Sequence, residues 1–154
     1  MSARGRICFA FITTGWLGAA VPDGAAWQAQ KLSLEAHIQQ LTGPATVDCG
    51  THTWTMLLRA TPKREAMHRS LACARDATKQ HNPFRIIQRG PGTDSEVAFG
   101  VLGQADGSVL WFDYDSAPCG GPRCSPRFET KPCLLSNVVV IHDAGGFHNF
   151  RCIG

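Results

Sequence analysis

Residues 61–115 decide the fold, and they read TPKREAMHRSLACARDATKQHNPFRIIQRGPGTDSEVAFGVLGQADGSVLWFDYD. From Met67 onward, apolar and small residues recur at helical spacing, with charged residues on the other face. Thr61 is the expected N-cap and Pro62 suits the first helical position. Pro83 stops the pattern, because proline disfavours a helical residue before it. The first part of the stretch therefore predicts one long helix over residues 61–80.

The second part of the same stretch predicts three strands. Three segments are rich in β-branched and aromatic residues whose side chains point alternately to opposite faces: residues 84–90, 96–103 and 108–115. Short runs that contain Gly, Pro and Asp connect them. In the last run, one face is expected to carry Val109, Trp111 and Asp113, and the other Leu110, Phe112 and Tyr114. Short links between strands indicate an antiparallel meander.

The flanking segments add smaller elements. Residues 27–41 have helical periodicity, and Gly43-Pro44 is a stop signal. Residues 46–50 suit a short strand that ends in a turn, and threonines that alternate with larger residues over 51–56 favour a strand before the long helix. Residues 128–133 predict an edge strand, and residues 137–142 and 147–152 a hairpin. The predicted fold class is α+β: an antiparallel sheet of about five strands packed against one main helix, with a shorter N-terminal helix and disulfide bracing.

The first residues have the pattern of a secretory signal peptide. Arg4 and Arg6 precede a mostly apolar run over residues 7–21, and Gly24-Ala25-Ala26 offers small residues for cleavage. The run is short for a membrane span. Residues 1–26 are therefore predicted to be a signal peptide, and residues 27–154 a single small domain that is secreted or periplasmic. No further segment is apolar enough to predict a membrane span.

Six cysteines follow the predicted signal peptide, and an even number in an exported chain indicates disulfides. They are Cys49, Cys73, Cys119, Cys124, Cys133 and Cys152. A bridge from Cys49 to Cys73 would fasten the long helix to the sheet, and the other four would brace a loop and the C-terminal hairpin. The competing interpretation is zinc held by the Cys119 and Cys124 pair, but a second pair at ribbon spacing is missing.

Charge is modest overall and uneven along the chain. The formal net charge is +3, which does not by itself indicate a nucleic-acid partner. Basic residues dominate from Arg59 to Arg89, whereas residues 94–115 carry only acidic ones. A solvated surface explains this distribution, and so does a polar partner site on one of the two faces.

Catalytic motifs of high specificity are absent from the sequence. It contains no G-x-S-x-G nucleophile elbow, no P-loop and no G-x-G-x-x-G fingerprint. The best chemical alternative is a divalent metal held by His142, Asp143 and His148 around the C-terminal turn, with His52 as a further ligand. That arrangement would suit a small metal-dependent hydrolase.

Acidic residues near the third strand of the meander form a second possible site. Asp113 and Asp115 share one strand face at about 7 Å separation, with Asp94 and Glu96 nearby in sequence. Paired carboxylates can perform acid/base chemistry on glycosides or bind calcium. Trp111 and Tyr114 could stack on a sugar ring. Turn positions and solvent exposure explain the same residues without any ligand.

The loop between Cys119 and Cys124 completes the predicted binding surface. Its tip residues are Gly120, Gly121, Pro122 and Arg123. A disulfide-bounded loop on a rigid sheet presents a preordered contact surface at low entropic cost. Together with Asp113 and Asp115, this loop favours a binding domain without a cofactor. Its predicted partner is another exported protein, toward which it acts as an inhibitor or immunity-type protein.

Overall fold

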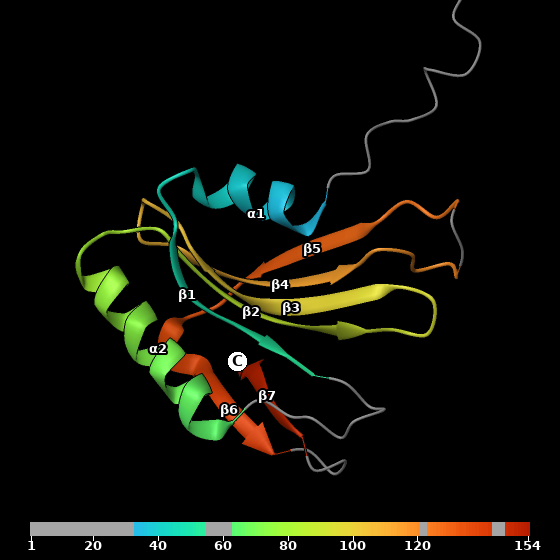
Figure 1. The fold of residues 1–154 in the computed structure, drawn as a ribbon. Coiled ribbons are helices and arrows are strands. Elements are labelled where there is room, and N and C mark those ends of the chain that lie inside the picture. The colour runs from blue at the N-terminus through green and yellow to red at the C-terminus, as the bar shows by residue number, and fades with distance from the viewer. Residues whose placement is uncertain (1–32, 55–62, 121–122, 143–146) are drawn as a thin grey trace, which may run out of the picture.

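The computed structural model describes residues 33–54, 63–120, 123–142 and 147–154 (Figure 1). It contains two α-helices, α1 (Leu34–Thr42) and α2 (Arg64–Lys79), and a short 3₁₀ turn at Leu135–Asn137. Its strands are β1 (Val47–Thr53), β2 (Phe84–Pro91), β3 (Glu96–Gly103), β4 (Val109–Asp115), β5 (Arg127–Pro132), β6 (Val138–His142) and β7 (His148–Cys152).

The first five strands form one sheet in chain order, and β6 and β7 pair separately as a two-stranded ribbon. From β2 to β5, each strand is antiparallel to the next, as the meander predicts. The predicted α+β class, strand number and disulfide bracing are confirmed. The β1 edge corrects one detail: β1 runs parallel to β2, so the sheet is mixed. A parallel neighbour is possible because α2 lies between the two strands as a crossover.

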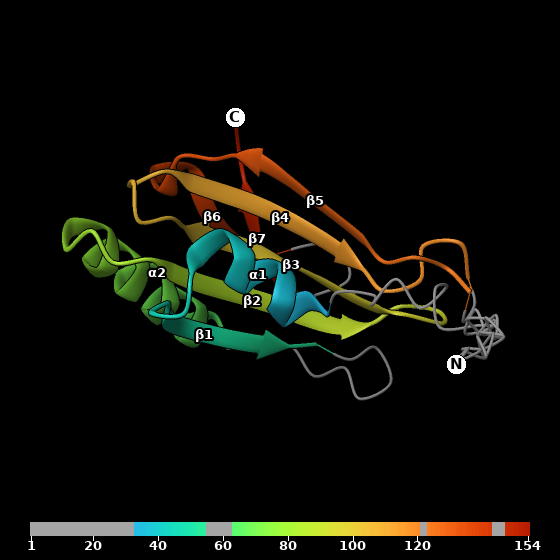
Figure 2. The ribbon, with the colours of Figure 1, turned by 90° about the horizontal axis from the view of Figure 1, so that it is seen from above.

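Both faces of the sheet are covered. Helix α1 lies on one face, and α2 together with the β6–β7 ribbon lies on the other (Figure 1). Seen from above, α1 crosses the middle of the sheet (Figure 2). The chain therefore has three layers, with the central sheet buried on both sides. This explains why its strands carry apolar residues at successive positions and not only at alternate ones.

The larger core lies between the sheet and α2. The helix contributes buried Met67, Leu71, Ala74 and Ala77, and the strands contribute Phe84, Ile86, Val101 and Trp111. The small alanines let the helix lie close to the strands. The predicted apolar stripe is confirmed. The predicted start at Thr61 and Pro62 lies outside the described residues, and the described part begins at Arg64 after Lys63.

The second core lies under α1. Leu34 and Ile38 pack against strand residues that point away from α2, including Ile87, Leu102 and Phe112. Ser33 caps this helix by accepting a hydrogen bond from Ala36 N, at 3.3 Å. Gly43 ends it with φ +80°, as the stop signal predicts. The predicted first turns, residues 27–32, lie outside the described residues.

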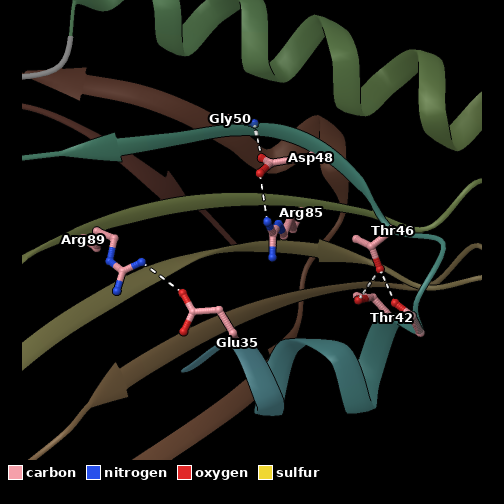
Figure 3. Close-up of polar contacts among 8 residues, drawn as sticks. Glu35, Thr42, Thr46, Asp48, Gly50, Arg85 and Arg89 are labelled. Atoms are coloured by element: carbon pink, nitrogen blue, oxygen red, sulfur yellow. Dashed lines mark hydrogen bonds and ion pairs between the residues drawn. The ribbon is translucent and has the colours of Figure 1, made fainter. Parts of the chain in front are cut away.

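Polar contacts complete the attachment of α1 (Figure 3). Arg89 Nη1 lies 3.0 Å from Glu35 Oε1 on the helix, and the same guanidinium also binds Glu96 on β3. Thr46 Oγ1 donates to Gly43 O at 2.6 Å, and it lies 2.7 Å from Thr42 Oγ1. These ion pairs are partly exposed, so each is worth at most about 1 kcal/mol. Apolar burial therefore holds α1 in place, and the polar contacts fix its register.

All six predicted disulfide cysteines are paired. Cys49 on β1 bonds to Cys73 on α2, which confirms the predicted anchor of the helix. Cys119 bonds to Cys124 within the β4–β5 connection, and Cys133 after β5 bonds to Cys152 at the end of β7. The zinc interpretation of Cys119 and Cys124 is therefore wrong, because sulfurs joined to each other are not thiolate ligands.

Three disulfides in a chain this small are typical of an extracellular domain. The predicted signal peptide, residues 1–26, lies outside the described residues. Among the helices that the structure describes, none has the length and apolar character needed to cross a membrane.

Candidate functional site

An aromatic cleft opens between the central sheet and the β6–β7 ribbon. Its volume is about 480 Å³, within the range of small-ligand sites. The sheet side contributes Trp54, Phe99, Trp111 and Asp113, and the ribbon side contributes Ile141, Phe147, Asn149, Phe150 and Arg151. Five of these described lining residues are aromatic. We call this site the aromatic cleft.

Strand alternation builds the sheet wall of the cleft. Phe99 on β3 pairs with Asp113 on β4, and Val101 pairs with Trp111, so all four point to the α2 side. The rings of Phe99 and Trp111 stack with centroids 5.7 Å apart and an interplanar angle of 24°. The ribbon does not cover this part of the sheet completely, which leaves Phe99 half-buried at the mouth.

Trp54 forms one end of the cleft, directly after β1. Its backbone N–H donates to Arg89 O at 3.0 Å, which continues the parallel pairing with β2. A Cβ placed on Gly90 would lie 2.6 Å from the Trp54 indole. Glycine at position 90 therefore lets the indole lie flat against the β2 backbone. The indole N–H of Trp54 is buried and finds no hydrogen-bond partner among the residues that the structure describes.

Gln88 fixes the ribbon wall. This fully buried side chain donates from Nε2 to His148 O at 3.0 Å and to Asn149 Oδ1 at 2.8 Å. Its Oε1 accepts from Phe150 N at 3.1 Å. One glutamine thus joins β2 of the sheet to β7 of the ribbon through three hydrogen bonds. The position of Phe150 and Asn149 in the cleft depends on it.

The rim of the cleft carries opposite charges. Asp113 is exposed and accepts a 2.9 Å hydrogen bond from Trp111 Nε1 at its Oδ2. Arg151 is exposed on the ribbon side. Asn149 also lines the cleft and carries a side-chain amide. An aromatic floor with a carboxylate, a guanidinium and an amide at its edge suits a ligand with flat apolar faces and polar edges.

Asp113 and Asp115 lie on the same strand, β4, and the acidic residues of this region make different contacts. Asp113 lies in the aromatic cleft, whereas Asp115 Oδ1 accepts from Ala117 N at 2.9 Å and shapes the following turn. Glu96 binds Arg89 on the α1 side of the sheet, and Asp94 is exposed in the β2–β3 connection. These carboxylates do not form a cluster of metal ligands in the described chain.

The disulfide-bounded loop lies at the same end of the sheet as Trp54. This follows from the strand directions, because β1 and β4 end where β5 begins. Gly120 has φ +68° and is exposed, as is Arg123. The two remaining predicted tip residues, Gly121 and Pro122, lie outside the described residues.

His142 and His148 face each other across the ribbon. They are register partners on β6 and β7, with ring centroids 4.8 Å apart. Asp143, the third predicted ligand, lies outside the described residues. His52 is not gathered with them, since the described residues contain no group of three or more His, Cys, Asp or Glu that could hold a metal. The metal site and its hydrolase chemistry stay a prediction.

His52 takes part in the packing below the ribbon. Its Nε2 lies 2.8 Å from Ser70 Oγ, and its ring centroid is 5.4 Å from that of Phe150. Burial lowers the pKa of His52 below its ordinary value of 6.5. Ser70 is itself buried and lies 3.3 Å from Ala66 O, so this pair links α2 to β1 and does not expose a nucleophile.

Acidification is expected to destabilise the fold through His52. Because the pKa is lowered in the folded state, the unfolded chain binds the proton more readily as pH falls below 6.5. Stability is therefore full above that pH and decreases below it. Melting temperatures of the parent and the His52→Gln variant between pH 7.5 and 5 test this. A parent and variant with the same pH dependence would contradict it.

A second group of charged residues lies between α1 and the β1–β2 edge, and its members form ion pairs with one another. Arg85 Nη2 lies 2.9 Å from Asp48 Oδ2, and the other Asp48 oxygen accepts from Gly50 N at 2.9 Å (Figure 3). Arg89 is bound by Glu35 and Glu96. These contacts serve the register of β1 and α1, so the aromatic cleft is the stronger functional candidate.

Sequence reasoning found Asp113 and Trp111 but missed most of the cleft. Trp54, Gln88 and Phe150 lie far apart in the chain and meet only through the fold. The available signal was Gln88, a polar residue at an inward strand position beside Phe84 and Ile86. Comparison with known proteins adds nothing to this picture: no family model, no curated protein and no solved structure matches the chain.

Proposed function

We propose that this chain is an exported binding domain whose recognition surface is the open end of the sheet around the aromatic cleft. The observation that supports it is the cleft itself: five aromatic side chains around a volume of about 480 Å³, with exposed Asp113 and Arg151 at the rim. Tryptophan and arginine, both present here, are among the side chains most enriched in binding hot spots. Disulfides support a rigid domain of this kind.

The partner that we propose is another exported protein, toward which the domain acts as an inhibitor or immunity-type protein. The Cys119–Cys124 loop and Trp54 lie at the same end of the sheet, so one partner can contact both. A loop closed by a disulfide loses little conformational entropy on binding. The proposed contact residues are Asp113, Asp115 and the loop tip Gly120, Gly121, Pro122 and Arg123.

Replacing Asp113 by asparagine is expected to weaken capture of the partner from an extracellular extract at least tenfold. The change removes the rim charge but keeps an oxygen that can accept from Trp111 Nε1. Glu129→Gln is the matched control, because Glu129 is Asp113's register partner on β5, is exposed, and does not line the cleft. Quantitative mass spectrometry of the captured proteins measures both.

Equal capture by the two variants would contradict the proposed surface. A partner lost with Asp113→Asn but kept with Glu129→Gln would support it, provided that both variants melt at the parent temperature. A third variant lacking residues 120–123 separates the loop from the cleft. Its loss of capture would assign the contact to the loop as well.

A further inference from the structure

We infer that the aromatic cleft binds a neutral carbohydrate, with a pyranose ring stacked on its aromatic wall. This inference rests on the proposed binding function and names the ligand class for the same site. The ligand would be a soluble oligosaccharide with uncharged hydroxyl or N-acetyl substituents. The argument uses the floor of the cleft, its rim and the rigidity of its walls.

The floor fits one face of a sugar ring. A pyranose has a flat face of C–H groups, and such groups pack well on aromatic rings, whose faces are electron-rich. On the sheet side the half-buried Phe99 offers the accessible ring, and the buried Trp111 stacks against it with an interplanar angle of 24°. Phe147 lies on the ribbon side, and Trp54 at the end of the cleft. A ring entering the cleft thus meets aromatic surface from both walls.

The rim selects against other ligands. A charged ligand would be attracted by one of the two rim groups, Asp113 and Arg151, and repelled by the other, so its charge would gain little there. Burying that charge would still cost desolvation, a cost that a neutral ligand does not meet. A purely apolar ligand would cover these charged groups without satisfying them, which is costly. Sugar hydroxyls both donate and accept, so they can donate to Asp113 and accept from Arg151. A polyhydroxylated neutral ring matches this mixture.

The walls are held before any ligand arrives. Gln88 joins the ribbon to the sheet, and the Cys133–Cys152 disulfide closes the same ribbon against the end of β5. Trp111 Nε1 donates to Asp113 and so orients the rim carboxylate. Side chains fixed in this way lose little freedom on binding, which favours recognition of a weakly apolar ligand.

The test is a titration of the oxidised full-length chain with cellotetraose and chitotetraose, followed by tryptophan fluorescence and isothermal calorimetry. We expect saturable binding of at least one of them, with a fluorescence change from Trp54 and Trp111. The charged analogues tetragalacturonic acid and chitosan tetramer are expected to bind at least tenfold more weakly. Asp113→Asn is expected to weaken the affinity for the neutral ligand at least tenfold, and Glu129→Gln is expected to leave that affinity unchanged.

Trp54→Ala tests the aromatic wall, and Trp54→Phe is its matched control. The alanine variant should lose binding while the phenylalanine variant keeps most of it, with melting temperatures recorded for both. Failure of both neutral tetrasaccharides to bind would overturn the inference, as would tighter binding of either charged analogue. If partner capture still depends on Asp113 in that case, the proposed binding function stands and only the carbohydrate assignment fails.

Discussion

Replacing Cys133 and Cys152 together by alanine is expected to lower the free energy of unfolding by about 3 kcal/mol. The bridge joins residues 19 apart in sequence, and closing a loop of that size removes about this much conformational freedom from the unfolded chain. Cys133 is buried in the core under α2 and the partly buried Cys152 packs against that core, so their loss also disturbs packing. The measurement is chemical denaturation of the parent and the double variant, monitored by far-ultraviolet circular dichroism.

The same double variant is expected to lose binding at the aromatic cleft. The bridge fastens the end of β7 to the segment after β5, and β7 supplies Asn149, Phe150 and Arg151 to the cleft. Hydrogen exchange should show faster exchange of the β6 and β7 amides than in the parent, with β2 to β4 less affected. Uniform acceleration over the whole sheet would contradict a local role for this bridge.

Cys119 and Cys124 provide the matched control. Their bridge joins residues only 5 apart, for which the same chain-entropy estimate gives about 2 kcal/mol. It lies in the β4–β5 connection, where Cys119 is exposed and Cys124 is buried. The alanine double variant at these positions should keep the protection of the ribbon. If both double variants expose β6 and β7 equally, the ribbon is not held by the Cys133–Cys152 bridge.

The sequence predicted the elements whose signals are local. The helix stripe from Met67, the strand ranges and the Gly43 stop depend on residues within a few positions of one another. The Cys49–Cys73 bridge was predictable because it joins β1 to α2, two elements that follow one another in the chain. Likewise, the alternation of Trp111 and Asp113 against Phe112 and Tyr114 follows from strand geometry alone.

The features that the sequence did not predict depend on contacts between distant segments. The parallel β1–β2 pair is a matter of where α2 crosses, and nothing local in residues 47–53 marks strand direction. The sequence also did not predict that α1 packs on the face of the sheet opposite α2, because that packing depends on contacts between distant segments. The aromatic cleft requires β7 to lie beside β2, which Gln88 and Asn149 specify through contacts about 60 residues apart. The one local signal was the polar residue Gln88 at a strand position that faces the core, which indicates a buried hydrogen-bond partner.

Gln88→Leu is expected to destabilise the fold by about 3 kcal/mol, although leucine has a similar volume and is more apolar. Gln88 is fully buried and makes three hydrogen bonds with β7. Leucine takes away the donor that serves His148 O and Asn149 Oδ1, together with the acceptor that serves Phe150 N. Removing one partner of a buried hydrogen bond costs about 1–3 kcal/mol, and these losses share one site.

Gln104→Leu is the control for this change. Gln104 is half-buried and donates from Nε2 to Leu41 O at 3.1 Å, on α1, which lies on the opposite face of the sheet from the ribbon (Figure 1). Its loss is expected to cost about 1 kcal/mol, since water can replace its partners. Urea denaturation of both variants measures the difference. Carbohydrate titration then shows whether binding is lost with Gln88→Leu alone.

A neutral effect of Gln88→Leu on stability would mean that apolar packing of Val138 and Phe150 suffices to hold the ribbon. The expected result is a selective one: the sheet, α1 and α2 remain folded at moderate urea while the ribbon exchanges its amides quickly. Gln88 would then be the residue that couples the binding site to the fold. The buried polar side chain of Gln88 positions Asn149 and Phe150 through directional hydrogen bonds. An apolar residue at this position could not form such bonds.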